Sequence, residues 1–197
     1  MDLNRSARRI VGVVAGLNLL GALVEGTIAA AIGSVALWAD AADFLEDFLI
    51  NALVLAALGW SVASRRKASY ALAGLILIPA VAALGTAVYK LANPSAPEAF
   101  ALTGTAVFAM VVNLVCAILL MRLRGGGALL RGAWLAARND VLGNVLIVAA
   151  GLVTFVWVSP WPDVAAGLLL AAVNLGAAKE VFEQARAEEP EIEFDHA

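Results

Sequence analysis

The segment Ala-Leu-Trp-Ala-Asp-Ala-Ala-Asp-Phe-Leu-Glu-Asp, residues 36–47, places four acidic residues inside a hydrophobic stretch of the chain. On insertion scales an ionised side chain at membrane depth costs about 2.5–3.5 kcal/mol, so four such residues add roughly 10 kcal/mol. A membrane helix keeps these residues mainly when they face a polar interior and act there. The segment therefore predicts a helix whose carboxylates form a functional cation site.

The composition around this segment is that of a membrane protein. The chain has 197 residues, of which 62% are hydrophobic, whereas soluble domains are nearer half apolar. A membrane-spanning helix needs about 20 mostly apolar residues, and no stretch shows the alternation of a strand. The sequence predicts an all-α, polytopic membrane protein with six transmembrane helices, near residues 10–32, 35–61, 70–92, 99–121, 133–157 and 162–183.

The basic residues predict an orientation. In a six-helix arrangement every Lys and Arg except Lys90 falls on one side of the membrane, which identifies that side as cytoplasmic. Both termini are then cytoplasmic, and a bacterial inner (plasma) membrane is expected. We predict one transmembrane domain over residues 1–186 and a short acidic tail over residues 187–197. With a net charge of −3 and its basic residues at membrane edges, the chain is not expected to bind nucleic acid.

Two pairs of polar residues are spaced to share helical faces. Asp43 and Asp47 are four residues apart, and so are Asp140 and Asn144, so each pair lies on one face of its helix. Counting at about 1.5 Å per residue from the outer ends of these two helices predicts Asp47 and Asn144 at similar depth, near mid-membrane. We therefore expect the four side chains to converge on one metal ion.

The chemistry of this set favours a hard divalent cation. Carboxylate and amide oxygens are the ligands preferred by Mn²⁺, Mg²⁺ and Ca²⁺, while Zn²⁺ prefers nitrogen or sulfur but accepts carboxylates. The only histidine, His196, lies in the tail. Metal binding to carboxylates displaces protons, which is the physical basis of metal–proton exchange. We expect no permanent cofactor, because the metal is the transported substrate.

Further polar residues lie within the predicted helices. Glu25 and Asp40 are candidates for a supporting or proton-carrying role beside the metal ligands. The alternatives are structural: Glu25 and Asp40 could lie at the membrane surface, and Asp140 could pair with Arg138. The asparagines Asn18 and Asn113 are expected to form hydrogen bonds between helices rather than to bind metal.

With these motifs in place, the sequence resembles the cation diffusion facilitator family over nearly its whole length. Residues 33–41, Gly-Ser-Val-Ala-Leu-Trp-Ala-Asp-Ala, look like the family's Gly-Ser-x-Ala-Leu-x-Ala-Asp-Ala motif at the start of the second helix. Asp43 and Asp47 match the His/Asp-x-x-x-Asp metal motif that follows it. Asp140 and Asn144 stand where the family has a second such motif, and Val24-Glu25 is also similar.

The resemblance implies a homodimeric exporter that exchanges cytoplasmic divalent metal for protons by alternating access. It assigns the metal ligands to Asp43, Asp47, Asp140 and Asn144. Both motifs begin with Asp where zinc-transporting members usually have a histidine, which favours Mn²⁺ and leaves Zn²⁺, Fe²⁺ and Co²⁺ open. Asn144 replaces a usual Asp, and an amide cannot exchange a proton near neutral pH. Only the short tail stands where the family has a cytoplasmic metal-sensing domain.

Two other functions are consistent with parts of this pattern. A non-transporting membrane subunit, binding or sensing a cation on the same fold, is suggested by Asn144 and the short tail. A membrane-embedded enzyme would also cluster Asp residues in the membrane. The consecutive Asp-rich turns of lipid head-group transferases are absent from the sequence, however, so we do not expect an enzyme.

Overall fold

The computed structural model describes residues 5–56, 81–123 and 128–173, and every regular element within these residues is a helix. The long helices are α1 (Arg5–Ile32), α2 (Val35–Ala56), α4 (Ala99–Met121) and α5 (Ala128–Val156). Two shorter apolar helices cover Val81–Ala92 and Trp161–Val173. The prediction of an all-α chain is confirmed for the described residues. Parts of three predicted helices (57–61, 70–80 and 174–183) and the acidic tail lie outside them.

Within the residues that the structure describes, three helical segments are long and apolar enough to cross a membrane: Arg5–Ile32, Ala99–Met121 and Ala137–Val156. Because a hydrophobic helix of about 20 residues matches the thickness of the hydrocarbon core, the chain is a membrane protein. Helix α2 has 22 residues and is long enough to span a membrane, but it is not among these three helices because it carries the four acids of residues 36–47.

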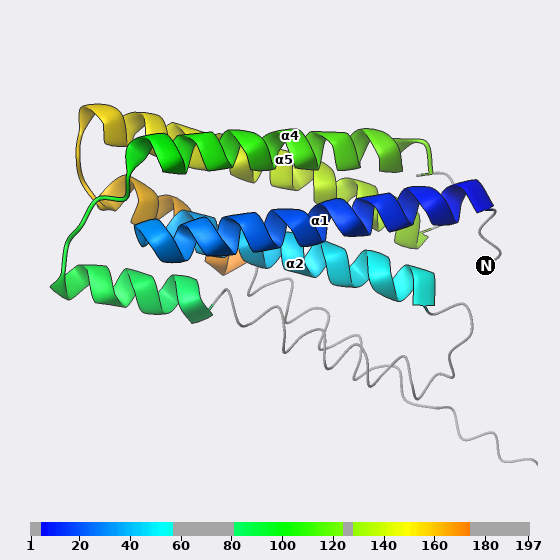
Figure 1. Cartoon of the computed structure of the whole chain (residues 1–197), viewed down its shortest axis with the longest axis horizontal. Helices are drawn as coiled ribbons and strands as arrows, with labels where there is room; N and C mark the ends of the chain where they lie inside the picture. Colours follow the sequence, from blue (N-terminus) through cyan, green and yellow to red (C-terminus); the bar gives the residue numbers. More distant parts are fainter. Residues whose placement is uncertain (1–4, 57–80, 124–127, 174–197) are drawn as a thin grey trace, which may run out of the picture.

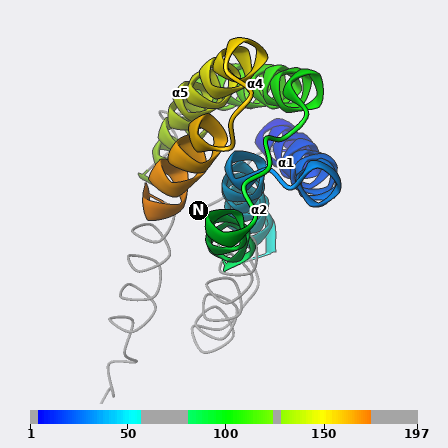
Figure 2. The same cartoon turned by 90° about the vertical axis from the view of Figure 1, so that its left-hand side faces the viewer.

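The four long helices form a closed bundle. Helix α1 packs against α2 and α4, and α5 packs against α4 and α2 (Figure 1). The short helix Trp161–Val173 continues the side formed by α4 and α5, and Val81–Ala92 lies beside α2 (Figure 2). The chain reverses between α1 and α2 at Gly33, whose φ of 63° lies in the left-handed region that glycine adopts without strain. The end of the bundle at this turn is called the Gly33 end.

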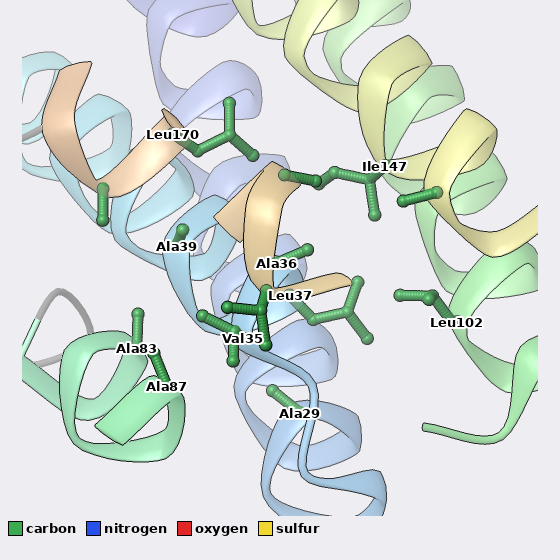
Figure 3. Close-up of a cluster of buried hydrophobic side chains, with 14 of the residues drawn as sticks. Ala29, Val35, Ala36, Leu37, Ala39, Ala83, Ala87, Leu102, Ile147 and Leu170 are labelled. Carbon is green, nitrogen blue, oxygen red and sulfur yellow. The ribbon is translucent and has the colours of Figure 1, made fainter. Parts of the chain in front are cut away.

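Two apolar clusters fill the bundle. The Gly33-end cluster joins six helices through small alanines, with Leu37, Leu102 and Ile147 among its larger members (Figure 3). The second, called the Phe44 cluster, centres on the buried ring of Phe44 and includes Val14, Val112, Cys116 and Leu120. The polar side chains of the bundle lie between and beside these clusters.

Asp163 fastens three helices together at the Gly33 end. Its carboxylate accepts hydrogen bonds from the Ser34 hydroxyl at 2.6 Å and from the backbone N–H groups of Val35 and Ala36 at 2.9 and 3.1 Å. The ammonium of Lys90 donates to the same carboxylate at 3.0 Å, with Lys90 only 2% exposed. Asp163 thus neutralises a buried lysine and satisfies the first N–H groups of α2, which lack partners within the helix.

Gly167 allows this junction to close. A Cβ added at Gly167 would lie 2.5 Å from the carbonyl carbon of Val35 and 2.6 Å from the nitrogen of Ala36. Real Cβ atoms do not approach backbone so closely. The absence of a side chain therefore lets the helix Trp161–Val173 rest directly on the first turn of α2.

Candidate functional site

Three contacts set the register of α1 against α2. They are spaced three or four residues apart along each helix, and they run in opposite directions on the two helices. From the Arg5 end to the Gly33 end the pairs are Asn18 with Asp47, Gly21 with Phe44, and Glu25 with Asp40. Because this spacing is one helical turn, the three pairs form a single interface. Two polar levels are thus separated by one apolar level.

The first polar level is built around Asp47. Its Oδ2 accepts a hydrogen bond from the Asn18 amide at 3.4 Å, and its backbone carbonyl accepts one from the Asn51 amide at 2.8 Å. The thiol of Cys116 on α4 donates to Oδ1 of Asn18 at 3.6 Å. Asn18 therefore connects α1 to α2 and α4, as predicted for an interhelical hydrogen-bonding residue.

The second polar level joins α2, α5 and α4 in one chain of hydrogen bonds. The Asn144 amide nitrogen donates to Oδ2 of Asp40, and the Asn113 amide nitrogen donates to Oδ1 of Asn144 at 3.0 Å. All three side chains are at most 1% exposed. The predicted bonding role of Asn113 is confirmed. Asn144, however, contacts Asp40 rather than lying at the depth of Asp47, two turns away on α2.

Glu25 completes this second level from α1. Its side chain is fully buried, and within the described part of the chain neither of its carboxylate oxygens has a hydrogen-bond donor. Its carboxyl group lies beside that of Asp40, close enough for the two charges to interact. Oδ1 of Asp40 is likewise buried without a donor among the described residues. Neither side chain is exposed on the bundle surface; the position of Glu25 and Asp40 relative to the membrane surface stays a prediction.

Asp43 and Asp140 lie on the side of the bundle where α2 contacts α5. Both are half-buried, and they are close enough for their charges to interact. The charge of Asp140 also interacts with that of Asp47. Arg138 does not reach Asp140 in this structure: its guanidinium donates to Asn139 at 3.4 Å and lies 5.5 Å from the ring centre of Trp134.

The predicted ligands therefore lie in the same region of the bundle, but they do not surround a common position for a metal ion. Among the described residues, no group of three or more His, Cys, Asp or Glu side chains is close enough to hold a metal ion. Asp43, Asp47 and Asp140 line neighbouring turns of α2 and α5, and Asn144 is bonded to Asp40. Direct metal binding by Asp43, Asp47, Asp140 and Asn144 stays a prediction.

Sequence reasoning missed the junction at Asp163. Lys90 stood out as the one basic residue on its side of the predicted membrane, and this isolation was the available signal. A lysine so placed needs a carboxylate when buried. Asp163, at the start of the sixth predicted helix, and Glu98, before the fourth, were acids on that side that could have been proposed as its partner.

Comparison with known proteins adds no identification to this geometry. No protein-family model matches the chain, and no curated protein matches it. The buried acids and their partners are therefore the basis on which a function is inferred.

Proposed function

We propose that this chain is a proton-coupled antiporter that moves a divalent metal cation, with Mn²⁺ favoured, across a bacterial inner membrane. In this proposal it has the six-helix transmembrane fold of the cation diffusion facilitators, with cytoplasmic termini, and works as a homodimer. Asp43, Asp47, Asp140 and Asn144 carry the metal, and Glu25 and Asp40 support them. The physiological direction is export.

The observation that carries the proposal is a set of buried and half-buried acids that, among the described residues, have no basic partner. Between described residues, no ion pair reaches any of five carboxylates, which are Glu25, Asp40, Asp43, Asp47 and Asp140. Acids inside membrane helices otherwise pair with one another or with backbone groups, or mark an ion pathway. The negative charge of these five must be balanced by protons or metal cations, and an antiporter exchanges one for the other.

The ligand chemistry supports the choice of metal. Carboxylate and amide oxygens surround the region, and the one thiol nearby, Cys116, is bonded to Asn18. Oxygen donors favour Mn²⁺, Mg²⁺ and Ca²⁺ over metals that prefer nitrogen or sulfur. Transport of Mn²⁺ by an oxygen-only site is therefore favoured, with Zn²⁺, Fe²⁺ and Co²⁺ as competitors.

The packing supports a transport cycle with a closed state. The level formed by Glu25, Asp40 and Asn144 has the Gly33-end cluster on one side and the buried ring of Phe44 on the other. A cation held there is shielded from both ends of the bundle. Release to either side requires one apolar cluster to open, as alternating access demands.

Proton movement in proteoliposomes tests the proposal. With a pH dye trapped inside, Mn²⁺, Zn²⁺, Fe²⁺, Co²⁺ and Mg²⁺ are added in turn to vesicles holding wild type, Asp47→Ala or Glu98→Gln. Glu98 is an exposed acid at the start of α4 and serves as the matched control. We expect sustained, metal-specific proton flux in wild type and Glu98→Gln and none in Asp47→Ala. No flux with any metal contradicts antiport.

One observation favours a non-transporting cation-binding or sensor subunit as the second candidate. Both polar atoms of the Asn144 amide are used in hydrogen bonds, to Asp40 and from Asn113, so Asn144 acts here as a bridge between helices. A subunit of this kind would release protons when metal binds but give no net flux. Proton release by detergent-solubilised protein, with silent proteoliposomes, would identify it.

A further inference from the structure

We propose that Glu25 and Asp40, together with Asn144, form a second cation site, which binds one divalent ion of the hard, oxygen-preferring class at a level of the bundle different from that of Asp47. The site rests on the proposed function, because it gives the transporter a further cation position, in which Glu25 and Asp40 are the carboxylate ligands and Asn144 is shared with the proposed transport site. In this role Glu25 and Asp40 touch the ion directly.

The first argument is that several carboxylate oxygens at this level have no hydrogen-bond donor among the described residues. Both carboxylate oxygens of Glu25 and one of Asp40 are buried and lack a donor in the described part of the chain. The two carboxyl groups lie close enough for their charges to interact. When both groups are ionised they only accept hydrogen bonds, so neither can then satisfy the other. A cation between them would satisfy both and would cancel their two negative charges.

The second argument is the enclosure of this level. Leu37 lies one turn from Asp40, and Ile147 one turn from Asn144, both in the Gly33-end cluster. On the opposite side, the ring of Phe44 fills the space beside Gly21. A pair of like charges in such apolar surroundings interacts strongly, since little water screens them. A divalent ion matches the charge of two carboxylates, whereas a monovalent ion leaves one charge uncompensated.

The third argument concerns the Asn144 amide. In this structure its nitrogen faces Asp40 and its oxygen faces Asn113. A half-turn of the amide would exchange these two atoms and present the oxygen to a cation at Asp40. Oδ1 of Asn113 is buried and, among described residues, has no donor. If the Asn113 amide turns as well, this oxygen accepts from the Asn144 nitrogen, so the bond between the two asparagines is kept.

The spacing along α2 separates this site from Asp47. Asp40 and Asp47 are seven residues apart, which is about 10 Å along a helix. The buried ring of Phe44 lies between their levels. One ion therefore cannot take both Asp40 and Asp47 as ligands. A cation between Glu25 and Asp40 is distinct from one held by Asp47 and Asp140.

Equilibrium dialysis of the full chain in detergent against Mn²⁺ tests the site, with bound metal measured by atomic absorption. The variants are Glu25→Gln, Asp40→Asn and Asp47→Asn, with Glu98→Gln as the exposed control. We expect Glu25→Gln and Asp40→Asn each to lose one bound Mn²⁺ per chain relative to wild type. Asp47→Asn should keep the ion that those two variants lose, and Glu98→Gln should match wild type.

Two results would overturn the site: unchanged Mn²⁺ stoichiometry and affinity in Glu25→Gln, or loss of all Mn²⁺ binding in Asp47→Asn. Because Glu25→Gln could fail to fold, Asp40→Asn provides an independent reading of the same ion. Failure of the proposed function looks different. Wild-type proteoliposomes would then show no metal-driven flux, while the loss of one bound Mn²⁺ in Glu25→Gln would still support the site.

Discussion

Gly21 on α1 makes room for the ring of Phe44 on α2: a Cβ added at Gly21 would lie 2.6 Å from Cδ1 and Cε1 of that ring. Phe44 is 1% exposed and lies at the centre of its cluster, so the ring has little freedom to move aside. This contact separates the Asn18–Asp47 level from the Glu25–Asp40 level. It therefore fixes how close the two helices lie where they carry their acids.

Gly21→Ala is expected to destabilise the protein. Overpacking a filled core costs about 1–3 kcal/mol, which exceeds the gain of about 0.8–1 kcal/mol from replacing glycine in a helix. Gly16→Ala is the matched control, because nothing lies within 4 Å of a Cβ there. Thermal unfolding in detergent should give a lower midpoint for Gly21→Ala and an equal or higher one for Gly16→Ala. Equal midpoints in the two variants would contradict the close contact.

Asp163→Asn should lower the stability of the protein more than a substitution of an exposed residue does. Removing one partner of a buried ion pair costs about 3–5 kcal/mol, because the other charge stays buried without compensation. The double variant Lys90→Met with Asp163→Asn should lose less stability than the two single variants together. Unfolding midpoints of the three variants check this. If the stability loss of the double variant equals the sum of the losses of the two single variants, Lys90 and Asp163 do not stabilise the protein through each other.

Asp47→Ala is expected to abolish metal-driven flux while the protein stays folded. An ionised Asp at mid-membrane costs about 2.5–3.5 kcal/mol on insertion scales, whereas the lost hydrogen bond from Asn18 is worth about 1.5–3 kcal/mol. The unfolding midpoint should therefore stay near that of wild type. Proteoliposome flux and thermal unfolding are measured on the same preparation. Wild-type flux in this variant would remove Asp47 from the mechanism.

Asn144→Asp should make the metal-free protein less stable and its metal response larger. The new carboxylate would meet Asp40 as a second acceptor where the amide now donates, at a cost of about 1–3 kcal/mol. Added Mn²⁺ should then raise the unfolding midpoint more than in wild type and release more protons per ion. Asn139→Asp, an exposed change on the same helix, is the control. A wild-type midpoint in chelator would argue against the Asp40 contact.

Local spacing was enough to predict which polar residues of α2 face the interior of the bundle. The i, i+3 and i+4 intervals on α2 place Asp40 and Asp47 on a buried face, and Asn18 and Asn113 bond between helices as expected. These features depend on the 3.6-residue period of one helix, which the sequence shows directly. The helical class follows from the same periodicity and from the hydrophobic content.

The relative depth of the helices could not be predicted in the same way. Sliding one helix past another by a turn leaves the same faces in contact, so face patterns do not fix depth. Our estimate relied on counting from helix ends, and it placed Asn144 level with Asp47 instead of Asp40. What sets the register is packing between distant residues, such as Gly21 on Phe44 and Gly167 on Val35. The Lys90–Asp163 pair, 73 residues apart in sequence, is of the same kind.

The carboxylate of Asp163 has a mechanical consequence. It accepts hydrogen bonds from two backbone N–H groups in the first turn of α2 and from Lys90 at the same time, so it links the ends of three helices into one body. A rearrangement that opens the Gly33 end must move this body as a unit against α1, α4 and α5. Its direct covalent tether to α1 is the short turn at Gly33, which therefore acts as the pivot.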